Sequence, residues 1–488
     1  MTEERPRSCD IAVRDGVIVD GSGGARYRGD LAISGDRIVA VGNLGGMTAE
    51  IDIDAAGKVA APGFIDVHTH DDNAVLVDGA MLAKVSQGVT TVVTGNCGIS
   101  LAPLVLEGAA PPPLDLLGGP GAYRFPTFGE YIEAFQHSPA TVNVAPMVGH
   151  STLRVATMPD LTRPASDREI GAMQALLREA MDAGAVGFST GLFYPAGRAA
   201  PMQEVVALLS VLTGTGALYA THMRDEADGV EESLDESFET ASRAGVPLVI
   251  SHHKCMGRRN FGRSRATLKR IDEARGRQPV GLDVYPYTAA STVLLPEFVE
   301  RAERVIVTWS RTHPEATGRE LSEIAGEWNV SPDEAIKRLV PAGAVYFMMD
   351  EEDVQRIMAY PHSMIGSDGL PHDEHPHPRL WGTFPRVLGR YVRELGLLTL
   401  EGAVHKMTGL TAVQFGLADR GELKPGFFAD IMIFDPQNVA DRATFEAPKE
   451  PSAGIELVMV AGDVVYRDGR PTAARPGRML LRGANGRP

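Results

Sequence analysis

Two histidines separated by one residue follow a short apolar run near the start of the chain. The run Gly-Phe-Ile-Asp-Val leads directly into His68, Thr69 and His70. In an extended strand alternate side chains share one face, so the two histidines point the same way. Neutral imidazole nitrogen is a good zinc ligand, and the spacing therefore predicts a metal chelate where a strand ends.

Four further strand-like segments end in residues that bind metals or transfer protons. They end at Cys97, at His222, at the adjacent pair His252 and His253, and at Asp368. Each segment is short, β-rich and followed by glycine or polar residues, as strands are at their ends. Reactive residues at the carboxyl ends of successive buried strands are typical of the active-site rim of a (β/α)8 barrel.

Three of these residues form a candidate zinc site. Cys97, His222 and one of the adjacent histidines supply sulfur and nitrogen, which leaves the fourth tetrahedral position for water, as in catalytic zinc sites. Strand alternation sends His252 and His253 to opposite faces, so one of them reaches the metal, and the spacing alone does not say which. Each residue taken singly also fits an ordinary buried side chain, and it is the joint pattern that favours a metal.

Asp368 is the candidate proton-transfer residue. A carboxylate beside a metal-bound water can take its proton and later deliver it to a leaving amine, whereas the alternative is a simple Ser-Asp-Gly turn. Lys254, Arg379 and Arg224 are the basic residues near the predicted rim. An arginine fork suits a substrate carboxylate better than a lysine point charge.

Two further observations limit the metal site. No lysine occurs between Lys84 and Lys254, which excludes a carboxylated lysine from that interval as a metal bridge and leaves a cysteine as the substitute. A second group of histidines lies in a proline-rich stretch, for which a solvated loop is the expected structure: His372, His375 and His377.

Composition restricts the class of protein. The net charge of −16 (47 basic and 63 acidic residues) argues against a nucleic-acid groove, and three cysteines are too few for a disulfide framework. Residues 1–7 lack the apolar core of a signal peptide, and no run of 18 apolar residues is present to span a membrane. We therefore expect a soluble cytoplasmic enzyme with a small-molecule substrate and with no nucleic-acid or membrane partner. Self-association is undetermined.

The pattern of strands and helices predicts two domains. Residues 8–60 alternate short strand patterns with glycine turns, and the same texture returns near the end of the chain. We predict an α/β fold in which a small β-sandwich, built from residues 1–62 and 416–488, flanks a barrel of residues 63–415.

Helices alternate with strands inside the barrel region. The clearest helix begins at Ser166, where Glu169 completes a capping box, and it ends before Gly184. The Pro/Gly-rich residues 103–126 predict a long loop over the barrel mouth. Residues 296–345 or thereabouts predict an inserted, mostly helical segment.

Seven short motifs together resemble the N-acyl-D-amino-acid deacylases, or D-aminoacylases, of the amidohydrolase superfamily. They are Gly63–His70, Gly95–Gly98, Gly187–Gly191, Thr221–His222, Ser251–Lys254, Asp283–Tyr287 and Gly366–Gly369. Two segments near the carboxyl terminus, Leu423–Asp430 and Val460–Tyr466, resemble the companion β-sandwich of that superfamily. The likeness covers essentially the whole chain.

The resemblance implies an enzyme that hydrolyses the amide bond of N-acyl-D-amino acids to a carboxylate and a free D-amino acid. It implies one tightly bound Zn²⁺ and a second, weaker metal site, with Asp368 as general base and acid. The tight ion would be held by Cys97, His222 and His252, and the weaker site would consist of His68 and His70 and share Cys97.

The resemblance also implies which residues bind substrate. The α-carboxylate would be held by Lys254, Tyr285, Ser291 and Arg379, and the insertion would shape the pocket for the amino-acid side chain. Whether that side chain is neutral or acidic is not decided, because the two arginines of the insertion, Arg301 and Arg304, also fit plain surface charges. The acyl-chain preference is open too.

Three alternatives are weighed against this reading. A cyclic amidase of the hydantoinase or dihydropyrimidinase type is disfavoured by the missing lysine, and a metal-dependent deaminase by the presence of the cysteine. A non-catalytic scaffold with the same fold is disfavoured because the ligand set is intact.

Overall fold

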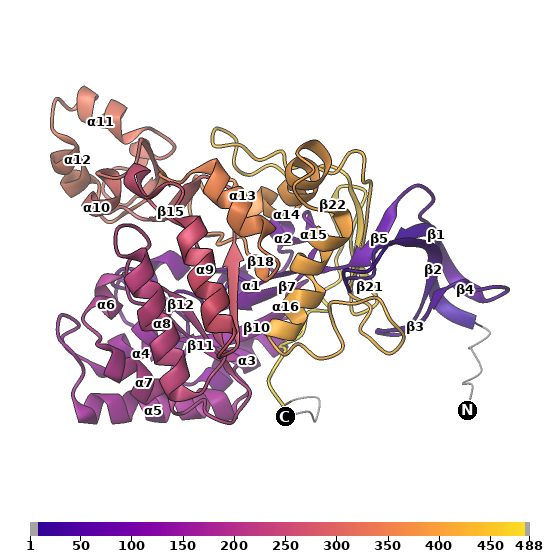
Figure 1. Cartoon of the computed structure of the whole chain (residues 1–488), viewed down its shortest axis with the longest axis horizontal. Coiled ribbons are helices and arrows are strands. Elements are labelled where there is room, and N and C mark those ends of the chain that lie inside the picture. The colour runs from indigo at the N-terminus through magenta and orange to yellow at the C-terminus, as the bar shows by residue number, and fades with distance from the viewer. Residues whose placement is uncertain (1–7, 484–488) are drawn as a thin grey trace.

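The chain forms a barrel with a β-rich domain at one end and an inserted layer at the other (Figure 1). The computed structural model describes residues 8–483. Residues 1–7, on which the expectation of no signal peptide rests, and residues 484–488 lie outside the described residues. Within residues 8–483, no helix combines the length and the apolar character needed to cross a membrane.

Eight parallel strands confirm the predicted barrel. In sheet order they are β18 (Ser363–Ile365), β14 (Val280–Val284), β13 (Leu248–Ile250), β12 (Leu218–His222), β11 (Gly187–Gly191), β10 (Asn143–Gly149), β7 (Val89–Thr94) and β6 (Phe64–Asp66). A parallel bridge between Thr69 and Gly369 joins the two ends of this order and closes the barrel. Because all the strands are parallel, their carboxyl ends form one rim.

A packed apolar core fills the barrel below that rim. Inward-facing side chains of several strands, among them Ile65, Met147 and Met364, belong to one buried cluster. Phe415 and Leu417 join this cluster from beyond the last barrel helix. Residues 478–480 also return to the barrel, where the Val144 N–H donates to the Arg478 carbonyl and the Leu480 N–H donates to the Val144 carbonyl. The last part of the chain therefore closes the amino-terminal end of the barrel as well as extending the small domain.

Helices surround the strands. The longer ones are α3 (Phe128–His137), α4 (His150–Thr157), α5 (Asp167–Asp182), α7 (Met202–Leu209), α8 (Val230–Ala244), α9 (Ser264–Arg275), α13 (Glu351–Ala359), α14 (Arg379–Arg386), π-helix η4 (Val387–Glu394), α15 (Leu400–Met407) and α16 (Gly409–Gln414). Shorter helices are α1 (Ala74–Val77), α2 (Leu82–Val85) and α6 (Pro195–Arg198). Helix α5 has the predicted capping box between Ser166 and Glu169, and Gly184 follows its end with φ +103°.

Both ends of the chain contribute to one nine-stranded sheet. Its strands are β1 (Ser8–Ile18), β2 (Tyr27–Ser34), β3 (Arg37–Gly42), β4 (Thr48–Asp54), β5 (Val59–Pro62), β19 (Ile431–Phe434), β20 (Ile455–Val460), β21 (Asp463–Arg467) and β22 (Arg470–Pro471). The two halves join where β5 pairs with β19. The sheet also folds back on itself, because Arg37 of the edge strand β3 bridges to Phe428, just before β19. One buried cluster then draws residues from both ends of the chain.

The insertion contains a sheet that its sequence did not predict. Strands β15 (Ala289–Val293), β17 (Ala342–Phe347) and β16 (Arg304–Ser310) form a three-stranded antiparallel layer. Helices α10 (Pro296–Val299), α11 (Leu321–Glu327) and α12 (Pro332–Leu339) accompany it at the far left of Figure 1. The strands pair across more than 30 residues of sequence, so no local pattern marks the sheet.

The predicted loop over residues 103–126 is not without structure. A two-stranded pair, β8 (Leu104–Val105) and β9 (Arg124–Phe125), closes it at the base, and a 3-10 turn at Leu114–Leu117 is buried within it. Two further 3-10 turns lie at Arg258–Asn260 and Pro314–Ala316.

Candidate active site

The Gly-Asn-Cys-Gly motif forms a turn that places a thiol at the rim and leaves no room for a side chain at Gly95. Cys97 follows β7 and is 2% exposed. Gly95 has φ +75°, and a Cβ on it would lie 2.1 Å from the carbonyl oxygen of Met147 on the next strand. Asn96 fixes the turn by donating from its side-chain amide to the Val93 carbonyl at 2.9 Å. The turn therefore holds the thiol over the barrel mouth.

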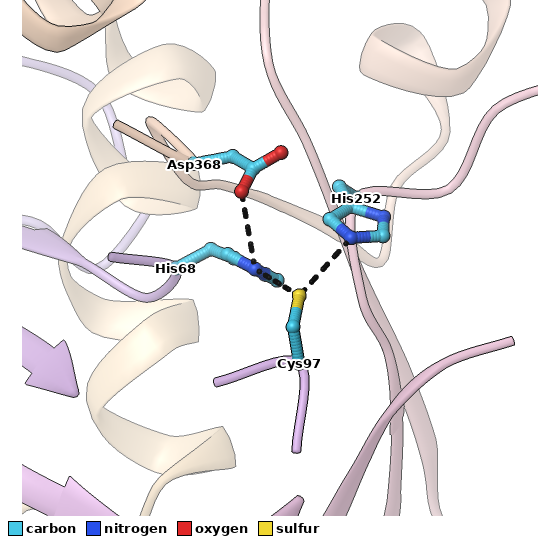
Figure 2. A group of neighbouring side chains, drawn as sticks. All are labelled: His68, Cys97, His252 and Asp368. Carbon is cyan, nitrogen blue, oxygen red and sulfur yellow. Dashed lines mark hydrogen bonds and ion pairs between the residues drawn. The ribbon is translucent and has the colours of Figure 1, made fainter. Parts of the chain in front are cut away.

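Two of the predicted metal ligands, His68 and His252, converge on that thiol (Figure 2). Nε2 of His252 lies 3.4 Å from the Cys97 sulfur, and Nε2 of His68 lies 3.2 Å from it. The ring centroids of His222 and His252 are 4.5 Å apart. Residues far apart in the sequence thus meet because their strands end at one rim.

His222 has a buried imidazole of the kind that binds metals. Both of its ring nitrogens are buried and neither has a hydrogen-bond partner. Burial lowers the pKa of this imidazole below its ordinary value, which keeps it neutral as metal binding requires. Buried polar nitrogens are rarely left unpaired in folded proteins, so the site fits an ion.

The electrostatics of the thiol also fit zinc. Burial by itself raises the pKa of Cys97, but the neighbouring His68 and His252 outweigh burial and lower the pKa well below its ordinary value. The thiolate is the form that coordinates metals. A thiolate with two imidazoles is the donor set of a catalytic zinc site, and the residues present therefore fit this ion.

The structure distinguishes the two adjacent histidines. His252 faces Cys97 inside the rim, whereas Nε2 of His253 bonds to the hydroxyl of Thr267 at 2.8 Å on helix α9. The predicted alternation of faces is therefore observed, and His252 is the one on the side of Cys97. Cys255 is buried, and among the described residues it does not belong to the group of possible metal ligands.

His68 and His70 form the opposite side of the site. Their Nε2 atoms lie 3.5 Å and 3.2 Å from the same carboxylate oxygen of Asp368. Thr69 points the other way and donates its hydroxyl to the Val93 carbonyl at 2.8 Å. The two imidazoles share a face, as their spacing predicts.

Asp368 occupies the centre of the charged contacts. Its second oxygen lies 2.9 Å from Nη1 of Arg379, and its backbone N–H donates to the His68 carbonyl at 2.7 Å. Burial alone raises the pKa of this carboxyl, but Arg379, His252 and His68 lower it well below the ordinary range. Asp368 is therefore held as a carboxylate that faces the ligand cluster.

Three residues of this site have a left-handed backbone. Cys97, His252 and Asp368 have φ of +53°, +36° and +51°. Such conformations cost about 1–3 kcal/mol each for residues other than glycine and persist only where the surrounding fold imposes them. All three lie directly beyond barrel strands, so the fold maintains this strain where the functional side chains converge.

The residues expected to bind a carboxylate lie together but are already engaged. Arg379 stacks on the Tyr285 ring at 4.7 Å and donates to the Ser291 carbonyl at 2.9 Å. The Ser291 hydroxyl is buried without a partner. Lys254 binds both oxygens of Glu226 at 2.8 Å and also contacts Nδ1 of His252 at 2.7 Å.

Sequence reasoning missed Glu226. Its carboxylate is 2% exposed and lies 3.0 Å from Nδ1 of His252 and 3.6 Å from Nε2 of His222. Burial by itself raises its pKa, but Lys254 and the two histidines lower it below the ordinary range. The signal available in the sequence was its position four residues after His222.

Asp283 also had no assigned role. Its side chain accepts from the His252 N–H at 3.0 Å and lies 3.4 Å from Nδ1 of His68. It therefore connects one histidine on each side of the site. Its position at the end of the strand-like run before Tyr285 could have suggested this.

The loop that carries three histidines differs from its predicted structure. The loop of His372, His375 and His377 is not simply solvated, because His377 is buried and its Nε2 contacts the Ala289 carbonyl at 3.1 Å. Packing against β15 of the insertion, which the sequence did not reveal, accounts for this.

Two of the three other arginines considered in the sequence, Arg224 and Arg304, form ion pairs with glutamates. Arg224 binds Glu236 at 2.8 Å and Arg304 binds Glu320 at 2.6 Å. Arg301 lines a surface hollow together with Asp228.

Comparison with known proteins gives matches along the whole chain. Residues 52–466 match the model of the amidohydrolase family. Three relatives from Alcaligenes xylosoxydans xylosoxydans are similar over their full lengths: a D-aminoacylase (54% identical, covering 99% of this chain and 100% of that protein), an N-acyl-D-aspartate deacylase (51%, 99% and 97%) and an N-acyl-D-glutamate deacylase (48%, 98% and 97%).

Solved structures agree with this result. A D-aminoacylase with a binuclear metal centre has a TM-score of 0.95 at 53% identity, and an N-acyl-D-glutamate deacylase from Bordetella bronchiseptica, complexed with zinc and a phosphonate inhibitor, has 0.94 at 47%. Each covers 97% of this chain and all of the other. A dihydropyrimidinase from Brevibacillus agri, with a TM-score of 0.61 at 17% identity over 98% of this chain and 99% of its own, shares the fold alone.

Proposed function

The chain belongs to the amidohydrolase family and, within it, to the N-acyl-D-amino-acid deacylases, and on this premise we propose that it hydrolyses N-acyl-D-amino acids to a carboxylate and a free D-amino acid. One observation carries the proposal: a thiolate, two imidazoles, a carboxylate and an arginine converge on one rim in a chain 54% identical, end to end, to a D-aminoacylase.

Zinc is the metal that these residues fit. Cys97, His222 and His252 would hold the tightly bound ion, and His68 and His70 would form a weaker second site that shares Cys97. When bound, zinc would polarise the amide carbonyl and make a nearby water more acidic. The assignment of tight and weak sites is supported by the unpartnered nitrogens of His222 and by the contacts of His68 and His70 with Asp368.

Asp368 transfers the proton. Its carboxylate accepts a proton from the attacking water while the new C–O bond forms at the amide carbon. It then donates that proton to the amide nitrogen as the C–N bond breaks, so the amine leaves neutral. Arg379 supports the first step, because its charge keeps Asp368 ionised.

Lys254, Tyr285, Ser291 and Arg379 bind the α-carboxylate of the substrate. Arg379 presents a fork that suits a carboxylate, and the free hydroxyl of Ser291 provides a further donor. Both cations contact protein carboxylates in this structure, Lys254 with Glu226 and Arg379 with Asp368. An incoming carboxylate therefore shares these cations and does not meet free charges.

The rival functions are less well supported. A cyclic amidase is similar at 17% identity only, and the interval between Lys84 and Lys254 offers no lysine to bridge two metals. A non-catalytic scaffold would not need the intact donor set or its strained backbone. The three relatives are named for different substrates, yet their identities to this chain differ by only six percentage points, from 48% to 54%. Similarity therefore does not assign the side-chain preference, and a substrate panel has to do so.

We also propose a cytoplasmic location. All three cysteines are free and buried, and a thiol that serves as a metal ligand must stay reduced. The substrate is a small molecule, and neither nucleic acid nor membrane is part of the proposal.

The deciding experiment measures amine release by zinc-loaded protein. N-acetyl-D-methionine, N-acetyl-D-glutamate and N-acetyl-D-aspartate are compared with N-acetyl-L-methionine and with hydantoin and dihydrouracil. Turnover of the D-isomers alone is the expected result, and the order among them assigns the side chain. Turnover of the cyclic amides without the linear ones would overturn the proposal, as would a failure to cleave any D-substrate with zinc bound.

A further inference from the structure

The barrel closes at a weak seam beside the active site. Strands β6 and β18 lie at the two ends of the sheet order, and the bridge between Thr69 and Gly369 is what joins them within the described chain. His68 and His70 follow β6, and Asp368 follows β18. The contact between the histidine pair and the carboxylate therefore spans the seam, where few ladder hydrogen bonds fix the distance.

A buried lysine bridges this seam. The ammonium of Lys84, on helix α2, lies 2.8 Å from Asp66, 3.1 Å from Asp71 and 3.0 Å from the Ser367 hydroxyl. The side chains of Lys84 and Asp66 are 0% exposed and that of Asp71 is 1% exposed. The ammonium group therefore donates hydrogen bonds to Asp66 and Ser367 and forms an ion pair with Asp71.

The partners of Lys84 flank the functional residues on both sides of the seam. Asp66 precedes His68 by two residues, Asp71 follows His70 directly, and Ser367 precedes Asp368. Asp66 also uses its other oxygen, which accepts from the Ser367 N–H at 2.8 Å and from the His68 N–H at 3.4 Å. One cluster, Lys84 with Asp66, Asp71 and Ser367, thus connects the segments that carry the chelate and the proton-transfer group.

Burying a cluster of charged groups costs folding free energy, so its presence points to a role other than stabilising the fold. Burying three charged groups loses their hydration, and well-packed apolar residues are often as stabilising or more so. Burial by itself lowers the pKa of Lys84, but Asp66 and Asp71 outweigh burial and raise it, so the lysine stays charged. Lys84 contacts Asp66, Asp71 and Ser367, so its effect on the chemistry passes through these partners.

We propose that Lys84 is a positioning residue that sets the distance between the His68–His70 pair and Asp368 across the barrel seam. The proposal rests on the roles given above to these three residues. Misplacement of a catalytic group by about 1 Å can lower the rate about 10²-fold, so the effect belongs in kcat. Substrate binding through Arg379 and Lys254 lies outside the cluster, and KM should change less than kcat.

Lys406 provides a matched control. It is also a buried lysine and also contacts β18, but at the first residue of that strand, through the Ser363 carbonyl at 3.2 Å and hydroxyl at 3.1 Å. Lys84→Met and Lys406→Met remove the same charge at the two ends of one strand. Both variants should lower thermal stability, but only Lys84→Met should lower kcat. A loss of kcat in Lys84→Met alone therefore reports a loss of positioning and not a general loss of stability.

The test compares these variants as zinc-loaded enzymes and by hydrogen–deuterium exchange. Lys84→Met is expected to lower kcat about 100-fold with zinc retained and to speed exchange in residues 66–72 and 366–370, while Lys406→Met leaves kcat and those segments unchanged. Ser367→Ala removes the hydroxyl that contacts Lys84 and the His68 carbonyl across the seam. This variant serves if Lys84→Met does not fold, and it should cause a smaller loss of kcat.

Two outcomes would overturn the proposal. One is a wild-type kcat in Lys84→Met, or in Ser367→Ala if Lys84→Met does not fold, with unchanged exchange at the seam. The other is an equal loss of kcat in Lys84→Met and Lys406→Met. Wild-type protein without deacylase activity would refute the proposed function instead, and the exchange experiment, which needs no substrate, would still decide whether Lys84 fixes the seam.

Discussion

Two buried lysines, at opposite ends of strand β18, show how differently the two ends of the barrel are built. Lys84, at the carboxyl end, faces two carboxylates, which raise its pKa. Lys406, at the amino end, contacts the carbonyl oxygens of Tyr360 and Ser363 and the Ser363 hydroxyl, and burial lowers its pKa to about 8. Charge is thus compensated where chemistry is expected and left uncompensated where the barrel is only closed.

The same contrast holds for the residues around them. The rim carries the strained backbone of Cys97, His252 and Asp368, whereas the other end is closed by apolar Phe415 and Leu417. A barrel can vary its rim residues because its core does not depend on them. Substitutions at the rim should therefore change activity or metal affinity, and substitutions at the closed end should change stability.

The largest effect is expected from Asp368→Asn. Loss of the proton acceptor should lower kcat by about 10³-fold or more while zinc stays bound, because general acid–base groups contribute about 10²–10⁴-fold and this one acts twice. Kinetics and metal analysis of the same sample check this. Asp353→Asn, which removes a buried aspartate bound to Gly262 and Ser264, is the control and should keep kcat. Full activity in Asp368→Asn would remove the residue from its role.

The next largest effect is expected from His252→Gln, for which the neighbouring His253→Gln is the control. His252→Gln should weaken zinc binding by about 10²-fold or more, since it removes one of three protein ligands that share the roughly 10–16 kcal/mol holding such an ion. His253→Gln should keep zinc and lose only the contact with Thr267. Competition with a chelator measures both. Equal zinc affinity in the two variants would contradict the assignment of His252.

A smaller effect is expected from Glu226→Gln. Groups that orient metal ligands contribute about 10–100-fold to metal affinity or activity, and Glu226 contacts both His252 and Lys254. KM should rise as well, because Lys254 loses the partner that holds it. Glu236→Gln, which breaks the partly exposed pair with Arg224, is the control. Equal metal affinity, kcat and KM in the two variants would show that Glu226 does not orient His252 or Lys254.

The smallest effect concerns pH and the closed end of the barrel. The pKa of Lys406 falls from 10.5 to about 8 in the folded state, so the unfolded chain binds more protons between these values and stability rises with pH across that window. Relative to Lys406→Met, the Tm of the wild type should increase by a few degrees from pH 8 to pH 10. A constant difference between the two Tm values would show that Lys406 titrates normally.

Much of the fold could be predicted because its signals are local. The barrel strands end in recognisable residues, and the helix from Ser166 carries its own capping box. The sheet of the insertion could not be predicted, since β16 and β17 pair across a long interval that contains two helices. The return of residues 478–480 to the barrel could not be predicted either, because these residues contact Val144, which is distant in sequence.

The amino-acid sequence by itself determined the chemistry available to this protein. The order of strand-like segments, each ending in a histidine, a cysteine or an aspartate, predicted that these side chains meet at one rim, because parallel barrel strands end on the same side. The tertiary structure decided what the spacing left open: that His252 and not His253 faces the thiol, that Glu226 holds His252 and Lys254, and that Lys84 spans the seam. These are contacts between residues distant in sequence or around tight turns, and they exist only once the barrel has closed.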